Sequence, residues 1–230
     1  MSTVLITGAN KGIGLELCRV YIEAGHQVIA CCREPNKAED LNALAEKGNI
    51  IILGVAIGED ESVSNMASQL EDKQIDILIN NAGTIGPKRE EQTAYKMDFD
   101  GWAETMNINV MAPVRVMHAL MPNLRASNDA KVVTISSQLG AISFDMAMGF
   151  AYSASKAAIN KYMRLAALEL IKENICVGLI HPGWVKTSMG GQEADITAEE
   201  SAAGIRQVVD NLNKENNGGF WKWNGEQHEW

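Results

Sequence analysis

Short runs of apolar, mostly β-branched residues alternate along the whole chain with longer segments of helical periodicity. The runs predicted as strands cover 3–6, 27–32, 50–55, 75–79, 131–135 and 175–180, with a further edge strand at 219–222. The helices expected between them cover 12–24, 38–46, 61–71, 101–125, 150–173 and 198–213. Runs such as VLI, IIIL and VVTI are continuously apolar, as strands covered on both faces are. This order predicts an α/β fold with a doubly wound parallel sheet and helices on both faces.

The chain has 230 residues, and neither a linker nor a low-complexity stretch interrupts the alternation. A length of this size corresponds to one domain, so we expect residues 1–230 to form a single domain. Pro113 lies inside the longest expected helix, and a proline there bends or divides a helix. We interpret the methionines of that helix as core residues; they are Met106, Met111, Met117 and Met121.

The chain carries 20 Lys and Arg residues against 29 Asp and Glu residues, which gives a net charge of −9. An acidic chain repels phosphate backbones, and no basic run offsets this, so we expect no nucleic-acid partner. No apolar stretch reaches the roughly 18 residues that a membrane span needs, and the first residues, MSTVLITG, lack a targeting pattern. We therefore expect a cytoplasmic protein without a membrane partner.

Cysteines and histidines are scattered without the spacing of metal ligands. The cysteines are Cys18, Cys31, Cys32 and Cys176, and the histidines are His26, His118, His181 and His228. No Cys-x-x-Cys pair occurs, and no two histidines are three or four residues apart, so we expect no metal site. The thiols are interpreted as small buried side chains, with Cys31 and Cys32 on opposite faces of their strand.

Three glycines lie in the segment TGANKGIG, directly between the first expected strand and the first expected helix. Such a turn brings backbone N–H groups close to a pyrophosphate, and the helix dipole favours the negative charge. We assign the tight turn to Gly8, the close phosphate approach to Gly12, and the packing of helix on strand to Gly14. A glycine-rich turn that binds nothing is the alternative, but the strand-to-helix position favours a dinucleotide site.

Arg33 follows the second expected strand, where a dinucleotide-binding enzyme meets the adenosine ribose. An acid at that point suits the 2′-hydroxyl of NAD, and a base suits the 2′-phosphate of NADP. The segment CCREPNK has no acid before Arg33, and Lys11 lies inside the glycine turn. Two cations there would form charge-assisted hydrogen bonds with a phosphate, so NADP(H) is the preferred cofactor and NAD(H) the alternative. On the competing interpretation both are ordinary surface cations.

A Tyr-x-x-x-Lys pair, Tyr152 and Lys156, lies in the expected helix 150–173. Residues four apart share one face of a helix, and this helix follows a strand that ends in Ser136 and Ser137. A free tyrosine titrates near ~10, and a nearby ammonium stabilises its phenolate, which suits the phenol to acid–base work near pH 7. The spacing alone is common on solvated helices, so the rest of the chain must decide.

Five segments occur in a fixed order: TGANKGIG, NNAG, SSQLG, YSASK and HPGWVKT. Together they resemble the short-chain dehydrogenase/reductase family over essentially the whole chain. More narrowly, HPGWVKTSMGG, NNGGFWKWNGE and Trp230 resemble the C-factor-like and sniffer-like carbonyl reductase branch. The resemblance implies a single-domain Rossmann fold that binds a nicotinamide dinucleotide.

On this resemblance, Ser137 hydrogen-bonds the substrate carbonyl and Tyr152 is the general acid for reduction. Lys156 holds the nicotinamide ribose and lowers the pKa of the phenol. In the segment NINVMAP, Asn109 matches the family asparagine that holds a proton-relay water. Asn107 is the competing candidate, and the spacing to the following proline favours Asn109.

The resemblance also implies where the cofactor binds. NNAG lines the adenosine side and steadies the central strands, with a simple turn as the alternative, and HPGWVKT contacts the nicotinamide carboxamide. Ligands in such folds lie at the carboxyl ends of the strands, which fits both placements. The expected cofactor residues are Gly8, Asn10, Lys11, Gly12, Ile13, Gly14, Arg33, Asn80, Ala82, Gly83, Tyr152, Lys156, Pro182, Gly183, Val185 and Thr187.

The chain departs from the family pattern in two places. Ala56 stands where the family often has an Asp that binds the adenine amino group, so adenine recognition would rest on backbone groups or be weakened. The interval from Ser137 to Tyr152 is slightly long, which predicts a longer substrate loop at about 139–150. A second substrate loop is expected at about 186–198. Apolar side chains in or beside these loops suit a bulky carbonyl substrate, with core filling as the alternative; they are Met146, Met148, Met189 and Trp184.

The function predicted is NADPH-dependent reduction of ketone or aldehyde carbonyls to alcohols, with a small-molecule substrate. An NAD-dependent alcohol dehydrogenase is the first alternative, and a C-factor-like signalling protein that binds the dinucleotide is the second. Family members often pair through the helices expected at 101–125 and 150–173, so we expect a homodimer or homotetramer. Three tryptophans near the end of the chain are expected on the sheet edge or at a subunit contact; they are Trp221, Trp223 and Trp230.

Overall fold

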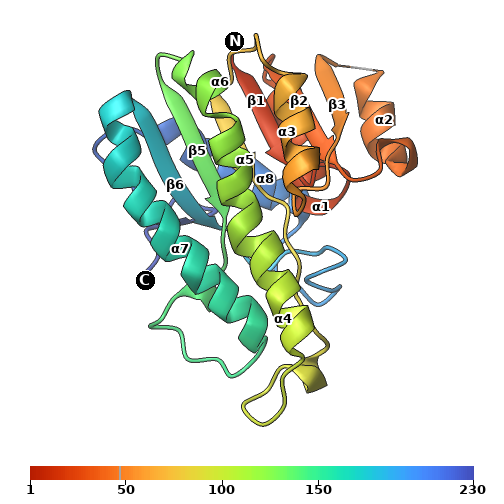
Figure 1. Ribbon diagram of the computed structural model, residues 1–230, viewed down its shortest axis with the longest axis vertical. Coiled ribbons are helices and arrows are strands. Elements are labelled where there is room, and N and C mark those ends of the chain that lie inside the picture. Colours follow the sequence, from red (N-terminus) through yellow and green to blue (C-terminus); the bar gives the residue numbers. More distant parts are fainter. Residues whose placement is uncertain (47) are drawn as a thin grey trace.

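Seven parallel strands form one sheet in the order β3-β2-β1-β4-β5-β6-β7 (Figure 1). This computed structural model describes residues 1–46 and 48–230. The strands are β1 (Thr3–Thr7), β2 (Gln27–Cys32), β3 (Ile50–Gly54), β4 (Ile77–Asn80), β5 (Ala130–Ile135), β6 (Ile175–His181) and β7 (Phe220–Lys222). Each neighbouring pair in the sheet is parallel. The predicted fold class is therefore confirmed, and the expected edge strand is β7.

Helices cover both faces of the sheet, as the doubly wound prediction requires. The face turned to the viewer in Figure 1 carries α3 (Asp60–Ser68), α4 (Phe99–Met106), α5 (Ala112–Ala119), α6 (Met121–Arg125) and α7 (Phe150–Leu170). The opposite face carries α1 (Gly12–Glu23), α2 (Glu39–Ala45) and α8 (Ala198–Asn211). Each face has its own cluster of buried apolar side chains, so the central strands contribute to two cores.

The adjacent cysteines of β2 show how one strand serves both cores. Cys31 belongs to the cluster with residues of α3, α5 and α7, and Cys32 belongs to the cluster with residues of α1, α2 and α8. Successive side chains of a strand point to opposite faces, which explains the division. The prediction of opposite orientations for these two thiols is confirmed.

The helix predicted over 101–125 is divided into several segments. α4 ends at Met106, a π-helical turn spans Asn107–Met111, and α5 and α6 follow. Pro113 has no N–H to donate to the carbonyl four residues earlier, which favours the wider turn before it. Pro122 opens α6 after Leu120, a second break that we did not predict. The remaining predicted ends differ from the observed ones by at most three residues.

The π-helical turn changes which side chains face inward. Asn109 is 1% exposed, whereas Met111 is 49% exposed on the outer side of the same turn. The interpretation of Met111 as a core residue is therefore wrong, because it assumed the regular periodicity of an α-helix across the break. Met117, in the regular helix α5, is buried as expected.

Three connecting segments gather beyond the carboxyl ends of the strands. They follow β4, β5 and β6, and they extend below the sheet in Figure 1. Parallel α/β sheets bind their ligands at this edge. None of the helices in the described part of the chain has both the length and the apolarity that crossing a bilayer demands.

Candidate active site

Tyr152 and Lys156 lie on the first turns of α7, one turn apart. Gly149 precedes the helix with a φ of +57°, a left-handed conformation that favours glycine and lets the chain enter α7 sharply. The Lys156 Nζ lies 5.6 Å from the centroid of the Tyr152 ring. The helical spacing therefore brings the ammonium beside the phenol, as the sequence pattern predicts.

Lys156 is 5% exposed and is held against the end of β5. Its Nζ donates a hydrogen bond to the main-chain carbonyl of Ile135 at 2.8 Å. Burial lowers the pKa of Lys156 to about 8, because the charged form loses its hydration. An ammonium has three hydrogens, so two remain to bind hydroxyl groups of a ligand such as a ribose.

Ser137 lies two residues beyond the end of β5 and caps a short 3₁₀ turn, with its hydroxyl accepting from the Leu139 N–H at 3.2 Å. Two effects act on the pKa of Tyr152: burial raises it, and a hydrogen bond with the Ser137 side chain lowers it. Burial is the larger effect, so the pKa of the phenol is raised above its ordinary value, whereas the resemblance led us to expect that Lys156 lowers it. The serine hydroxyl and the phenol thus share one polar position at the strand edge.

Gly140 allows this serine turn to pack directly on α7. A Cβ on Gly140 would lie 2.7 Å from both the carbonyl carbon and the Cβ of Lys156, closer than real Cβ contacts allow. The close approach fixes Ser137 relative to the two α7 residues. Our sequence analysis missed this glycine, although it stands in SSQLG beside the serine.

Asn109 and Asn107 lie on different sides of the π-helical turn. Asn109 accepts a hydrogen bond from the Thr84 N–H at 2.8 Å and donates to the Thr84 carbonyl at 2.8 Å. It also donates to the Ser155 hydroxyl at 3.0 Å. Asn107 instead donates to the Gly58 carbonyl at 3.2 Å, away from α7. The structure therefore brings Asn109, and not Asn107, to the Tyr152 helix.

Ser155 links the asparagine to the tyrosine. It is fully buried, accepts from Asn109, and donates to the Tyr152 carbonyl at 2.7 Å. Because Ser155 directly precedes Lys156, this chain of bonds fixes the turn of α7 that carries both site residues. We did not single out Ser155 from the sequence, since a lone serine on a helix gives no signal.

The glycine turn after β1 packs against the NNAG segment after β4. A Cβ on Gly8 would lie 2.8 Å from the Cα of Ala82, and one on Gly14 would lie 2.2 Å from the Gly8 carbonyl oxygen. Gly8 also has a φ of +66°. Any larger side chain at these two positions would force the turn, the helix and the neighbouring strand end apart.

Thr7 and Asn81 hold these two segments together. The Thr7 hydroxyl accepts from the main-chain N–H groups of Asn81 and Ala82, each at 3.1 Å. The Asn81 side chain donates to the carbonyls of Thr7 and Gly8, at 2.9 and 3.2 Å. Asn80, which we expected in the site, has a buried side chain without a hydrogen-bond partner among the described residues. The residue that clamps the turn is therefore Asn81.

The start of α1 has the features of a phosphate cradle. Lys11 is the N-cap residue, and neither a side-chain cap nor an acidic residue occupies the first turn. Gly12 has a φ of +54°, and a Cβ there would lie 3.1 Å from the Thr187 methyl carbon. Asn10 and Ile13 flank these residues in the same turn. The free N–H groups of the helix start and the absence of a Cβ fit a pyrophosphate.

Arg33 and Lys11 are exposed at the same edge of the sheet. They follow β2 and β1, which pair in parallel from Thr3 with Gln27 to Thr7 with Cys31. The neighbouring carboxylate of Glu34 is paired with Lys37 at 2.5 Å, and no ion pair of Arg33 occurs within 1–46 and 48–230. This arrangement fits a ligand phosphate between two cations.

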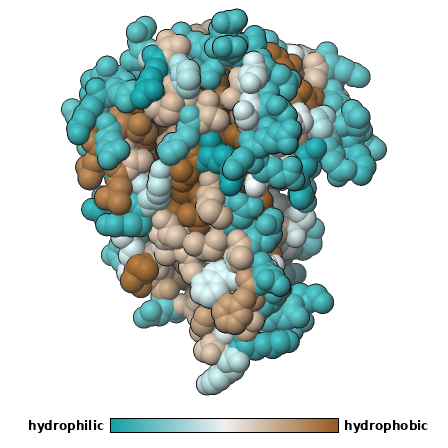
Figure 2. All heavy atoms as spheres, in the orientation of Figure 1, coloured by the Kyte–Doolittle hydropathy of each residue, from teal (hydrophilic) through white to brown (hydrophobic). Residues whose placement is uncertain are grey.

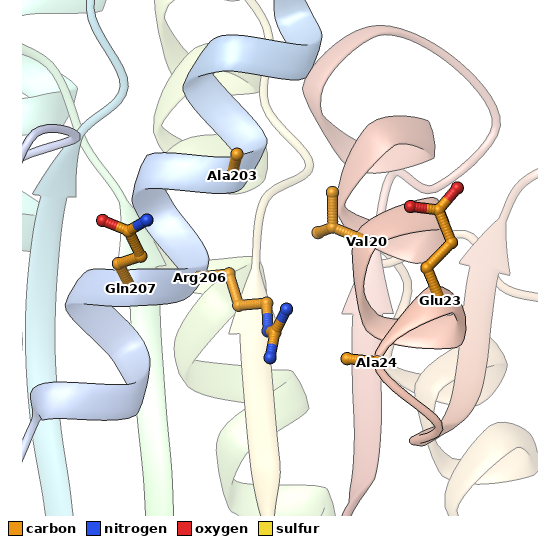
Figure 3. A pocket seen from close by; sticks show the side chains of 6 residues that line it. All are labelled: Val20, Glu23, Ala24, Ala203, Arg206 and Gln207. Carbon is orange, nitrogen blue, oxygen red and sulfur yellow. The ribbon is translucent and has the colours of Figure 1, made fainter.

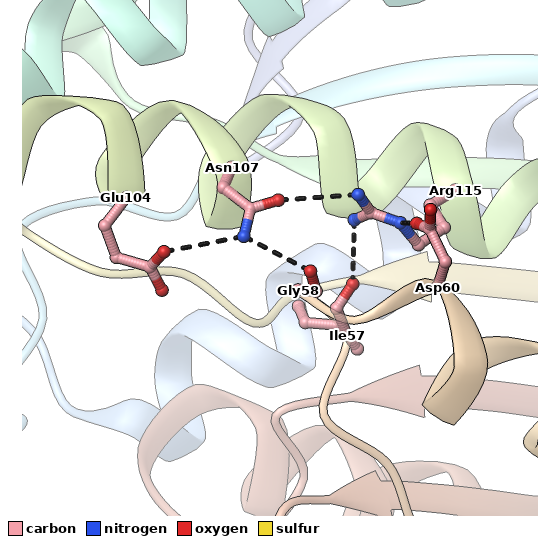
Figure 4. A network of polar contacts seen from close by, with 6 residues as sticks. All are labelled: Ile57, Gly58, Asp60, Glu104, Asn107 and Arg115. Carbon is pink, nitrogen blue, oxygen red and sulfur yellow. Dashed lines mark hydrogen bonds and ion pairs between the residues drawn. The ribbon is translucent and has the colours of Figure 1, made fainter.

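The segment around Ala56 is fixed by an arginine from α5 (Figure 4). Arg115 donates to the Ile57 carbonyl at 3.1 Å, binds the Asp60 carboxylate, and contacts the Asn107 side-chain oxygen at 3.4 Å. The Ala56 N–H donates to the Ser62 hydroxyl at 2.9 Å. The segment that carries Ala56 in place of an aspartate is thus anchored to the π-helical turn through its backbone.

Residues after β6 form a loop that is closed on itself. Val185 and Ile196 form an isolated parallel bridge, and the Trp184 indole donates to the Gly190 carbonyl at 2.8 Å. Gly183 has a φ of +86°, and a Cβ there would lie 2.6 Å from the Ile196 side chain. Pro182 lies between β6 and this glycine, so the expected nicotinamide segment stands at the strand edge.

The apolar side chains of the two expected substrate loops are exposed. Met146 and Met189 are each 48% exposed, Trp184 is 47% exposed, and Met148 is 38% exposed. Core filling is therefore excluded for these four residues. Their surfaces are available to a substrate at the carboxyl edge of the sheet.

Two other features were considered as sites. A hollow of about 250 Å³ lies between α1 and α8, lined by Val20, Glu23, Ala24, Ala203, Arg206 and Gln207 (Figure 3). It lies on the face of the sheet opposite α7, so it does not include Tyr152 or Lys156. Three or more His, Cys, Asp or Glu side chains do not gather as metal ligands anywhere in the described ranges.

We predict that the buried charge of Lys156 costs stability in a pH-dependent way. Its pKa is about 8 in the folded protein and about 10.5 when unfolded, so the unfolded chain binds more protons between these values. The contribution of Lys156 to the free energy of unfolding should therefore rise with pH through this window, by up to about 3 kcal/mol, whereas buried thiols such as Cys18 and Cys31, whose pKa values are raised by burial, give the opposite slope in the wild type and the variant alike. Urea unfolding at pH 7 and pH 10 measures it, and in Lys156→Met the rise from this group should be absent.

Lys161→Met is the control, since Lys161 lies exposed on the same helix. This variant should follow the wild type at both pH values. An equal pH dependence of Lys156→Met and the wild type would show that the ammonium carries no burial cost.

Comparisons with known proteins place the chain in a family. The model of the family described as short chain dehydrogenase matches residues 2–197. The C-signal protein of Myxococcus xanthus is 36% identical over 157 residues, which cover 68% of this chain and 93% of that protein.

Two solved structures are similar along the whole chain. Carbonyl reductase Sniffer of D. melanogaster has a TM-score of 0.93 and 28% identity, with 100% of both chains covered. The NADPH-bound carbonyl reductase from chicken fatty liver has a TM-score of 0.91 and 30% identity, covering 100% of this chain and 99% of that chain. The resemblance inferred from the sequence is confirmed: the chain belongs to the short-chain dehydrogenase/reductase family of oxidoreductases, in the branch with C-signal and the sniffer-like carbonyl reductases.

Proposed function

We propose that this protein is an NADPH-dependent reductase that converts ketone or aldehyde carbonyls to alcohols. The observation that carries the proposal is the group formed by Ser137, Tyr152 and Lys156. A serine hydroxyl, a phenol and a buried ammonium meet at the carboxyl edge of the sheet, beside a glycine turn fit for a dinucleotide. The similarity to two carbonyl reductases supports the choice of substrate class.

The chain's own residues would bind and protonate the carbonyl. Ser137 donates a hydrogen bond that polarises the substrate oxygen, and Tyr152 gives its phenolic proton to that oxygen as the alcohol forms. NADPH supplies the hydride when it is bound. Lys156 would stabilise the phenolate that remains, because its buried charge lies 5.6 Å from the centre of the ring.

Lys156 and Asn109 would restore the proton. A Cβ on Gly83 would lie 3.8 Å from the Lys156 Nζ and 3.2 Å from the Asn109 side-chain oxygen, so the two side chains flank one glycine. We assign Asn109 the water that passes a proton towards Lys156. Its side chain is held by Thr84 and Ser155, which fixes its position relative to α7.

NADPH is the proposed cofactor because of Arg33 and Lys11. These exposed cations lie where a 2′-phosphate would meet the end of β2, and an acid that would favour NAD is lacking before Arg33. The chicken reductase is described as NADPH-bound, which supports the same choice. An NAD-dependent alcohol dehydrogenase is the alternative within the family.

A signalling protein that binds the dinucleotide without turnover is the second candidate, favoured by the similarity to C-signal. A panel of ketones, aldehydes and quinones with NADPH separates the two. Turnover of any panel member supports the reductase, whereas tight NADPH binding without turnover across the panel supports the signalling protein.

We propose a homodimer formed by the face of α5 and α7. Figure 2 shows apolar side chains gathered on this face of the molecule. Leu168 is 65% exposed, Leu165 is 50% exposed, and Met111 borders a groove of about 330 Å³ beside Tyr162. Exposed apolar surface of this kind is favourable to cover, and a second copy of the same face is self-complementary under two-fold symmetry.

Tyr152→Phe should reduce kcat by about 10²–10⁴-fold, because the ring is kept and only the proton donor is lost. The Kd of NADPH should stay close to the wild-type value. Steady-state kinetics and fluorescence titration measure the two effects. A variant that keeps most of its kcat would remove Tyr152 from the role of general acid.

Arg33→Asp should reverse the cofactor preference. Loss of a charge-assisted hydrogen bond and repulsion of the 2′-phosphate should lower kcat/KM for NADPH by about 10–100-fold, while NADH gains. The ratio of kcat/KM for the two cofactors is the measurement, and Arg89→Asp is the control because Arg89 lies in the segment after β4. An unchanged ratio would show that Arg33 does not bind the 2′-phosphate.

Leu165→Glu together with Leu168→Glu should give a monomer, because charged side chains would be buried in the proposed interface. Light scattering after size exclusion measures the mass. Tyr95→Ser, a change at a fully exposed residue outside this face, should leave the mass unchanged. A wild-type protein that is monomeric at micromolar concentration contradicts the proposal.

A further inference from the structure

The segment after β7 turns back and runs beside that strand. Trp221 and Gln227 form an antiparallel bridge, and the His228 N–H donates to the Phe220 carbonyl at 2.8 Å. The Lys222 N–H donates to the Glu226 carbonyl at 2.7 Å. We call residues 223–230 the return segment. Its course brings Trp230 back towards α7 and the loop at 141–149, near which Figure 1 marks the end of the chain.

Two contacts of its side chain hold Trp230 in place. Its ring lies 5.5 Å from the Phe220 ring centroid, and the Arg164 guanidinium lies 4.7 Å from the Trp230 ring. It packs against the same buried cluster as Phe144, a residue of the loop at 141–149. A large aromatic ring between a buried phenylalanine and a cation is a firm anchor.

The backbone of Trp230 holds the loop at 141–149. Its main-chain oxygen accepts a hydrogen bond from the Ser143 N–H at 3.1 Å. The other described backbone bonds of this loop are local and join residues two to four positions apart; they run from Ala141 to Gln138, from Phe144 to Ala141, from Met146 to Phe144, from Met148 to Met146 and from Ser153 to Gly149. Ile142, Met146 and Met148 are exposed, so the loop gains little from burial of its own side chains.

The return segment also supports the start of this loop. His228 stacks on Phe220 at 4.5 Å and meets the His181 ring edge-on at 5.5 Å. The Nδ1 of His181 accepts a hydrogen bond from the Gln138 N–H at 3.2 Å, directly after Ser137. Burial lowers the pKa of His181 to about 4, with His228 and Lys222 adding to the effect. A neutral His181 therefore keeps its acceptor nitrogen at neutral pH.

We propose that Trp230 is a specificity-determining positioning residue for the carbonyl substrate. The ring of Trp230 holds the residue in place, and its main-chain oxygen binds the Ser143 N–H. Together these contacts fix the position of the loop at 141–149 and of its exposed methionines. A bulky apolar carbonyl compound would contact these methionines, whereas a small aldehyde would reach Ser137 and Tyr152 without them. The expected effect of Trp230 on substrate selectivity rests on the proposed reductase function. Its effect on the order of the loop does not depend on turnover.

The test compares Trp230→Ala, Trp230→Phe and Glu229→Ala in the full chain. Trp230→Ala should raise KM for a bulky aryl ketone by about tenfold and change KM for a small aldehyde by less than about twofold. The Kd of NADPH should stay within about twofold of the wild type. Trp230→Phe should keep most of the wild-type selectivity, because the phenyl ring at position 230 can still pack against Phe220. Glu229→Ala changes an exposed neighbour and should behave as the wild type.

Hydrogen exchange gives a second readout that needs no substrate. The Ser143 amide should exchange faster by about tenfold or more in Trp230→Ala, while amides in β5 and β6 keep their protection. An equal rise in KM for the bulky ketone and the small aldehyde would overturn the proposal. An unchanged exchange rate of the Ser143 amide would overturn it as well. If the wild type reduces no carbonyl compound, the proposed function fails, and the exchange at Ser143 alone decides the role of Trp230.

Discussion

The site depends on a lysine ammonium that the fold keeps almost completely out of water. Lys156 is bound to the last carbonyl of β5 and lies beside the Tyr152 ring. Placing a charge there is unfavourable unless a polar group binds it, and the carbonyl of Ile135 is the group that does so. Gly83 lets the segment after β4 pass close to the ammonium, because a Cβ at Gly83 would lie 3.8 Å from the Lys156 Nζ and 3.2 Å from the side-chain oxygen of Asn109. β5, the segment after β4 and the π-helical turn therefore meet around this lysine.

Glycines and short side chains make that meeting possible. Gly140 lets the serine turn touch Lys156, Gly8 lets the first turn touch Ala82 in the segment after β4, and Gly14 lets α1 touch the Gly8 carbonyl. Each contact is too close for a Cβ, so packing alone requires a glycine at these positions.

The fold was predictable because strand and helix periodicities are local and repeat along the chain. The pairing of Tyr152 with Lys156 was predictable because helical spacing fixes it. The π-helical turn could be anticipated only as a disturbance at Pro113, since its direction depends on packing against α7. Clamps such as Asn81 on Thr7 join residues more than 70 positions apart, so no local pattern announces them. Such a clamp is recognised as a buried polar residue inside a loop, and its burial is visible only in the tertiary structure.

The loops at the substrate edge are held by three different means, and this difference bears on specificity. The segment after β4 is held by Asn109 and by Gln92, whose side-chain oxygen accepts from the Ala151 N–H at 3.0 Å. The loop after β6 closes on itself through Trp184. The loop before α7 has little internal support and leans on Trp230. A change in the first support would disturb Tyr152 and Lys156, because α7 carries both residues. A change in the return segment would move the loop before α7 and leave these two residues in place, so on the proposed function it should alter the substrate range and not the proton transfer.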